Sequence, residues 1–188
     1  EEKTQKRQEA QGLFREAAGV FESNLQTIRT RLESMPPGKL DPRKDAELIK
    51  QRDQFRADYV QAQLVSATIL YEMAATLKGN KEEYQKVLKE AAGKYNDVAE
   101  KYRRMLAGFF AKMFEGRCHQ DLGDYEQALD YARRLISSYA AASNVEEGVI
   151  AEGRALLRLE RYKEALSTFR KAGFNQPDAK VEVEALIR

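Results

Sequence analysis

Only two adjacent residues have side chains suited to nucleophilic or metal chemistry, because Cys118 and His119 are the only cysteine and the only histidine in the sequence. A structural zinc site takes four ligands from cysteines, histidines or carboxylates. Consecutive residues of an α-helix point about 100° apart, so these two side chains do not converge on one ion. We therefore expect Cys118 to be a buried small apolar residue and His119 to be a packing residue. The sequence predicts no metal site.

The carboxylates do not form a catalytic set. Pairs such as Glu82-Glu83, and Asp121 with Asp124, have the spacing of helix caps, turns or solvated helix faces. There is no glycine-rich phosphate loop, and any Ser/His/Asp arrangement would depend on the one histidine. We predict that the protein is not an enzyme and that it needs no cofactor.

Composition and charge limit the class of partner. The 188 residues include 32 Lys or Arg and 30 Asp or Glu, and the resulting net charge of +2 does not indicate nucleic-acid binding. Tyr84, Tyr95 and Tyr102, with basic residues between them, have the types needed to stack on single strands. A tyrosine stripe at helical spacing is more often part of a core. No apolar run reaches the roughly 18 residues of a membrane span. We expect neither nucleic-acid binding nor membrane insertion.

Long helices are expected over residues 1–104. Apolar side chains recur there at alternating spacings of four and three, which is the pattern of one face of an α-helix. Breaks at Pro36-Pro37-Gly38 and at Gly79 separate three such helices. The second helix carries a further apolar face, so we expect it to be covered on both sides. The stripe of the first helix consists of Phe14, Ala18, Phe21, Leu25, Ile28, Leu32 and Met35.

The rest of the chain contains a repeated pattern. A small residue, an aromatic residue and an alanine recur at an offset of 37, as Gly116, Tyr125 and Ala128 and then as Gly153, Tyr162 and Ala165. A fixed offset of this size is typical of stacked helical hairpins. No stretch alternates apolar and polar residues with period two. The predicted fold is therefore all-α, with about eight helices paired as antiparallel hairpins.

This pattern resembles the tetratricopeptide repeat (TPR). The later copy matches through Gly153, Tyr162, Ala165, Ala172 and Pro177, and the earlier one through Gly116, Gly123, Tyr125 and Ala128. Lys112 and Val149 replace the family's aromatic residue in the first helix, and the period is longer than the usual value of about 34. The resemblance implies a right-handed α-solenoid. Residues 105–188 would form TPR-like repeats, and residues 1–104 would be long antiparallel helices of a degenerate type in the same array. Another helical-hairpin repeat is the alternative.

The resemblance also implies a concave groove lined by the first helix of each pair. Arg117 and Arg154 are 37 residues apart, so they would stack on one wall and could bind carboxylates or peptide carbonyls. The alternative is that they are solvated arginines bonded to Asp121 or Glu115. The asparagine–lysine set that clamps a terminal carboxylate in some family members is absent. The candidate partner-binding residues are Phe110, Met113, Arg117, Gln120, Asp121, Ile150, Arg154, Leu157 and Arg158.

Two functions follow from these expectations. The first is a non-catalytic protein–protein interaction scaffold that holds a partner peptide or protein in the groove. The second is a structural role, in which the long N-terminal helices pair with another copy or another subunit. By analogy, a helical-repeat chain that begins without methionine suggests a processed protein of the bacterial envelope or periplasm. The apolar stretch Val181 to Ile187 leads us to expect that the array continues past Arg188, because a terminal repeat has a polar outer face.

Overall fold

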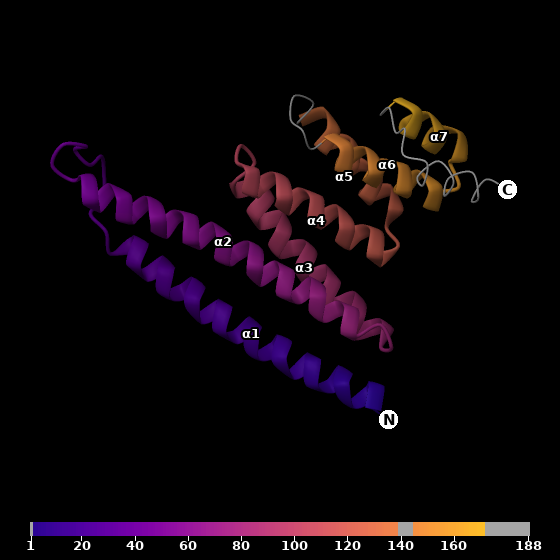
Figure 1. Cartoon of the computed structure of the whole chain (residues 1–188), viewed down its shortest axis with the longest axis horizontal. Helices are drawn as coiled ribbons and strands as arrows, with labels where there is room; N and C mark the ends of the chain where they lie inside the picture. Colours follow the sequence, from indigo (N-terminus) through magenta and orange to yellow (C-terminus); the bar gives the residue numbers. More distant parts are fainter. Residues whose placement is uncertain (1, 139–144, 172–188) are drawn as a thin grey trace. The chain divides into compact units, whose positions relative to one another are not determined.

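A computed structural model describes residues 2–138 and 145–171 (Figure 1). Every regular element in these residues is an α-helix, which confirms the all-α prediction. The eighth helix, expected after Pro177, lies outside the described residues. The chain divides into two compact units, Glu1–Ala111 and Lys112–Arg188. The helices are α1 (Glu2–Glu33), α2 (Ala46–Thr76), α3 (Lys81–Lys101), α4 (Leu106–Leu122), α5 (Tyr125–Ser138), α6 (Val145–Arg158) and α7 (Tyr162–Lys171).

The first unit is built around α2, which packs against both α1 and α3 (Figure 1). This arrangement confirms that α2 is covered on two sides, and its residues Ser66, Ala67, Leu70 and Ala74 are buried. The whole predicted stripe of α1 is partly buried, whereas Leu13 and Val20 on its other side are 68% and 52% exposed. Helix α1 therefore covers α2 with one face only.

Helix α3 begins where the sequence predicted it. The Asn80 side chain accepts a hydrogen bond of 3.3 Å from the backbone N–H of Glu83, which caps the helix. The middle of the tyrosine stripe is core, because Tyr95 has no exposed surface and its hydroxyl lies 3.0 Å from the Thr68 hydroxyl. Tyr95 is therefore not available for stacking on a nucleic acid.

The lengths of α2 and α3 differ. Helix α2 has 31 residues and α3 has 21. The end of α3 lies beside the middle of α2, because the Gln63 amide donates a 3.1 Å hydrogen bond to the Tyr102 hydroxyl. Residues 46–58 of α2 therefore extend past the end of α3, together with the adjoining part of α1 (Figure 1).

The second unit contains α6–α7 and, from Lys112 onward, α4–α5, two helical hairpins whose turns have the same backbone structure. In the first turn the N–H of Gly123 bonds to the carbonyl of Gln120, and the N–H of Asp124 bonds to that of His119. The second turn repeats both bonds 37 residues later, from Glu160 to Leu157 and from Arg161 to Leu156. This pair of bonds is the Schellman motif, which ends a helix at a residue with left-handed backbone. The repeat seen in the sequence is thus also a repeat of backbone geometry.

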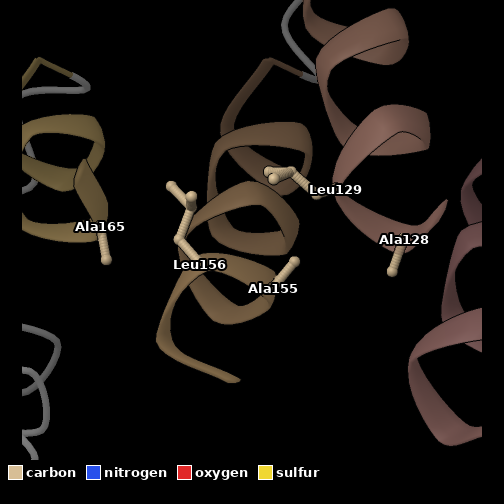
Figure 2. Packing of buried hydrophobic residues seen from close by; sticks show 5 residues of the cluster. All are labelled: Ala128, Leu129, Ala155, Leu156 and Ala165. Carbon is tan, nitrogen blue, oxygen red and sulfur yellow. The ribbon is translucent and has the colours of Figure 1, made fainter. Parts of the chain in front are cut away.

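The core of the second unit joins its helices through small and branched side chains. Figure 2 shows α6 between α5 and α7, with Ala155 and Leu156 of α6 placed between Leu129 and Ala165 of the neighbouring helices. A Cβ atom at Gly153 would overlap the ring of Phe169, and one at Gly116 would lie 3.2 Å from the Cβ of Tyr131. Both repeat glycines therefore lie at close approaches between helices. Tyr125 and Tyr162 each begin the second helix of their hairpin.

No helix in the part of the chain that the structure describes is long and apolar enough to cross a membrane.

Candidate functional site

The second unit contains a hollow between α4, α5 and α6 with a volume of about 240 Å³. Its walls combine small, apolar and basic side chains. Five of the nine residues predicted to bind a partner line it. The complete lining consists of Met113, Gly116, Arg117 and Gln120 from α4, Ala128, Tyr131 and Ala132 from α5, and Ile150, Ala151 and Arg154 from α6.

The hollow exists because the residues at its floor are small. Gly116 packs directly against Tyr131, and Ala128 and Ala132 are buried on α5. Side chains of this size bring the helices together and leave space above them that larger residues would fill. Two of these three small residues, Gly116 and Ala128, belong to the pattern that repeats through the sequence, so the small residues that allow close packing also shape the hollow.

Arg117 and Arg154 place positive charge on the hollow. Both side chains are exposed, and neither forms an ion pair with any described residue. The guanidinium carbon of Arg117 lies 4.9 Å from the centroid of the Phe114 ring, a cation–π contact that leaves its N–H donors free. Neither Glu115 nor Asp121 neutralises Arg117, in contrast to the alternative considered above. The two guanidiniums therefore keep their capacity to bind an anionic group.

Other arginines of the second unit are already paired. Arg133 lies 2.9 Å from Glu152, Arg134 lies 2.8 Å from Asp130, and Arg161 lies 2.7 Å from Glu164. Exposed pairs of this kind contribute little stability. Arg117 and Arg154 differ from these three, because neither forms an ion pair with a described residue.

A buried carboxylate fixes one wall. Glu115 is 2% exposed, and it accepts a 2.5 Å hydrogen bond from the hydroxyl of Tyr131. Lys112 Nζ lies 3.0 Å from Glu115 Oε2 and 4.4 Å from the centroid of the Tyr131 ring. Burial and the bond to Glu115 raise the pKa of the Tyr131 phenol above its usual value. Tyr131 is therefore a neutral donor held in one orientation.

The cysteine and the histidine have the packing roles that the sequence predicted. Cys118 is fully buried, and burial together with the charges of Asp121 and Glu115 raises the pKa of its thiol to about 12. The thiolate needed for nucleophilic attack is therefore scarce at neutral pH. The ring of His119 stacks on Tyr131 with 5.2 Å between centroids, and its Nδ1 lies 3.5 Å from Asp124 Oδ2.

Four predicted binding residues lie outside the hollow. Asp121 and Arg158 are exposed, and Leu157 packs against the apolar core of the second unit. Phe110 belongs to the first unit, where it lines a different cavity. Binding by any of the nine residues stays a prediction, but the hollow brings together Met113, Arg117, Gln120, Ile150 and Arg154.

Sequence reasoning missed the residues that α5 contributes. Tyr131 and Ala132 line the hollow, and Glu115 is buried behind it. The sequence held one signal for Tyr131, because it follows Ala128 by three residues and therefore lies on the same helix face. The burial of Glu115 had no such signal, since an acidic residue in a helix is normally exposed.

Within the described ranges, no group of three or more His, Cys, Asp or Glu side chains is placed to hold a metal ion. Comparison of the chain with protein-family models, with curated proteins and with solved structures found no match in any of the three.

Proposed function

We propose that the second unit is a non-catalytic protein-interaction domain that holds an acidic segment of a partner protein against the hollow. One observation carries this proposal: Arg117 and Arg154 border the same cavity, and neither is neutralised by a described residue. An arginine presents its N–H donors in a planar fork that fits a carboxylate. Two such groups on one cavity select for a ligand with more than one acceptor.

The size of the hollow favours a peptide side chain over a free small molecule. Small-molecule sites usually enclose roughly 300 to 1,000 Å³, and this cavity measures about 240 Å³. Met113 and Ile150 give it an apolar part, so a side chain with an apolar stem and a carboxylate fits its chemistry. The rigid Tyr131 wall reduces the entropy that binding would cost.

The proposal extends to the architecture of the chain. The offset of 37 residues, the repeated Schellman turns and the paired glycines support a TPR-like right-handed solenoid, in which the hollow is a segment of a longer groove. In such an array the first helix of each hairpin supplies the ligand contacts. Arg117 and Arg154 lie on the first helices of the two hairpins.

A displayed library of random peptides tests the proposal. We expect peptides selected on the native chain to be enriched in Asp and Glu, and their affinity, measured by fluorescence anisotropy, to fall at least about tenfold in Arg117→Glu and in Arg154→Glu. Arg134→Glu is the matched control, because Arg134 is exposed but outside the hollow. Equal binding by the Arg117→Glu/Arg154→Glu double variant would refute the proposal.

We also propose a second function, self-association of the first unit, because Leu13 and Val20 are exposed seven residues apart on α1. Residues seven apart lie on one face of a helix, which is the spacing of a coiled-coil seam. Light scattering over a range of concentrations tests it. We expect a dimer that Leu13→Glu with Val20→Glu converts to a monomer, and a native chain that stays monomeric at high concentration would exclude this function.

A further inference from the structure

An apolar groove in the first unit has no role in the functions proposed above. It has a volume of about 750 Å³ and runs along α2 to the turn between α3 and α4. All the residues that line it belong to the first unit. Its apolar lining includes Val60 and Leu64 on α2, Tyr102 and Met105 at the turn, and Leu106 and Phe110 at the start of α4.

The groove follows from the unequal helix lengths. Helix α3 stops beside Gln63, so the preceding turns of α2 have α1 on one side and no α3 residue on the other. Residues 46–58 span roughly 20 Å at 1.5 Å per residue. Three of these residues, Asp53, Arg56 and Ala57, line the groove together with Lys101 and Tyr102 at the end of α3.

Large apolar side chains are exposed at the edge of this groove. Met105 is 53% exposed, Leu106 62% and Phe110 40%. Single exposed apolar residues are common, but a contiguous group beside an apolar cavity marks an interaction surface. These three residues lie within one turn and the first turns of one helix, so they form one patch.

The border of the groove is basic. Lys101 lies over the rings of Tyr59 and Tyr102, at 5.2 and 5.4 Å from their centroids. Arg56 stands on the opposite side, where it pairs with Asp53 at 3.3 Å. Among these border residues the cations outnumber the carboxylates, so the border attracts an acidic ligand.

We propose that this groove binds an amphipathic α-helix of another protein, with its apolar face against Val60 and Leu64 and acidic residues along its flanks. Three features favour a helix: the lining runs from α2 to the start of α4, it includes the residues at the end of α3, and the anchors are apolar with a charged border. A flat lipid surface fits less well, because Val60 and Leu64 lie on the groove floor while the exposed residues stand at its edge. This inference uses no residue of the hollow around Arg117.

A selection with helical peptides tests the proposal. The probe is a displayed library of peptides of about 16 residues, roughly four helical turns, with leucine fixed on one face and the other positions random. We expect enrichment of Asp and Glu at the positions beside the leucines. The affinity of the selected peptides should fall at least about tenfold in Leu106→Glu and should weaken with added salt. Lys163→Glu is the control, since Lys163 is also exposed but lies on α7 outside the groove.

Footprinting of Met105 separates the groove from other surfaces. In the free chain we expect peroxide to oxidise Met105 rapidly, and we expect a bound peptide to protect it. Slow oxidation of Met105 in the dilute free chain would overturn the proposal, because the groove would already be covered by the chain itself. Oxidation that slows only with rising protein concentration would also overturn it, because a second copy of the chain would then cover the groove.

Other outcomes would overturn the proposal as well. Selection of basic peptides would contradict the charge of the border. Protection of Met105 by anionic phospholipid vesicles, without any peptide binding, would indicate a lipid surface as the ligand. If Arg154→Glu abolished peptide binding while Leu106→Glu left it unchanged, the peptide would bind at the hollow around Arg117, and the proposal for the groove would be rejected.

Discussion

Gly123 and Glu160 occupy equivalent turn positions 37 residues apart, and both have left-handed backbone, with φ of +82° and +59°. Glycine adopts this conformation without strain, whereas a residue with a side chain is disfavoured in it by about 1–2 kcal/mol. Glu160 is the only described non-glycine residue with positive φ. The two hairpins therefore share a turn that is relaxed in the first copy and strained in the second.

Glu160→Gly should stabilise the second unit. The relief of strain exceeds the entropy that glycine adds to the unfolded chain, so we expect a net gain of about 0.5–1 kcal/mol in the free energy of unfolding. Gly123→Ala should cost about 1 kcal/mol for the opposite reason. Urea unfolding followed by circular dichroism measures both. Glu160→Ala is the control and should change little. If Glu160→Gly lowered the free energy of unfolding, the contacts of the Glu160 side chain would stabilise the fold by more than its left-handed backbone destabilises it.

The two repeat glycines should differ in their response to alanine. At Gly153 the added methyl overlaps the Phe169 ring, so we expect Gly153→Ala to cost about 1–3 kcal/mol. At Gly116 the new Cβ would lie 3.2 Å from the Cβ of Tyr131, a contact that a small shift relieves. Alanine gains about 1 kcal/mol of helix propensity over glycine, so Gly116→Ala should be close to neutral.

A double variant separates overlap from other effects at Gly153. Phe169→Leu removes the ring, so Gly153→Ala should cost less in that background than in the native chain. Equal costs in the two backgrounds, measured by thermal unfolding, would show that Phe169 does not set the requirement for glycine.

Glu115 depends on Tyr131 for a hydrogen bond at a buried position. Tyr131→Phe leaves one carboxylate oxygen without that donor, so we expect a loss of about 1–3 kcal/mol in the free energy of unfolding. Combining Tyr131→Phe with Glu115→Leu removes both partners and should recover part of the loss. Chemical denaturation of the two variants measures the difference. Additive effects would mean that the bond between these two side chains contributes nothing.

Cys118 should be inert in the folded chain and should make stability fall at alkaline pH. Its thiol pKa is raised from 9.0 unfolded to about 12 folded. Above pH 9.0 the unfolded state gives up this proton while the folded state keeps it, so stability is lost between the two values. Cys118→Ala should flatten this part of the stability–pH curve.

The Cys118 thiol should also be unreactive in the folded chain. A thiol reagent at pH 8 should react only after denaturant is added, and rapid reaction in buffer alone would contradict the buried position of the thiol.

The sequence was sufficient for features that depend on local pattern. The apolar stripe of α1 predicts its buried face, the break at Gly79 predicts the boundary before α3, and the offset from Gly116 to Gly153 predicts two equivalent hairpins. Each of these rests on spacing within a helix or on the chemistry of a cap or turn. An eighth helix is predicted only for residues outside the described ranges, so it stays a prediction.

The composition of the hollow depends on contacts between helices, which no local pattern specifies. Phe110 and Leu157 have the expected positions on their helices, but one lies in the other unit and one packs into the core. Glu115, two residues before Arg117, is buried and accepts a hydrogen bond from Tyr131, which no pattern in the sequence indicates. The apolar groove of the first unit was not predicted. It forms because α3 ends beside Gln63, short of the start of α2, and this depends on how the two helices pair.

No residue of α1 whose side chain is described is fully buried, although the helix spans 32 residues. Its attachment to α2 therefore rests on many partial contacts, with no deeply inserted anchor. Such an element separates from its support at a lower free energy than the whole unit needs to unfold. Amide hydrogens of α1 should exchange with solvent well before those of α3, and limited proteolysis should cut within α1 while α2 and α3 remain intact.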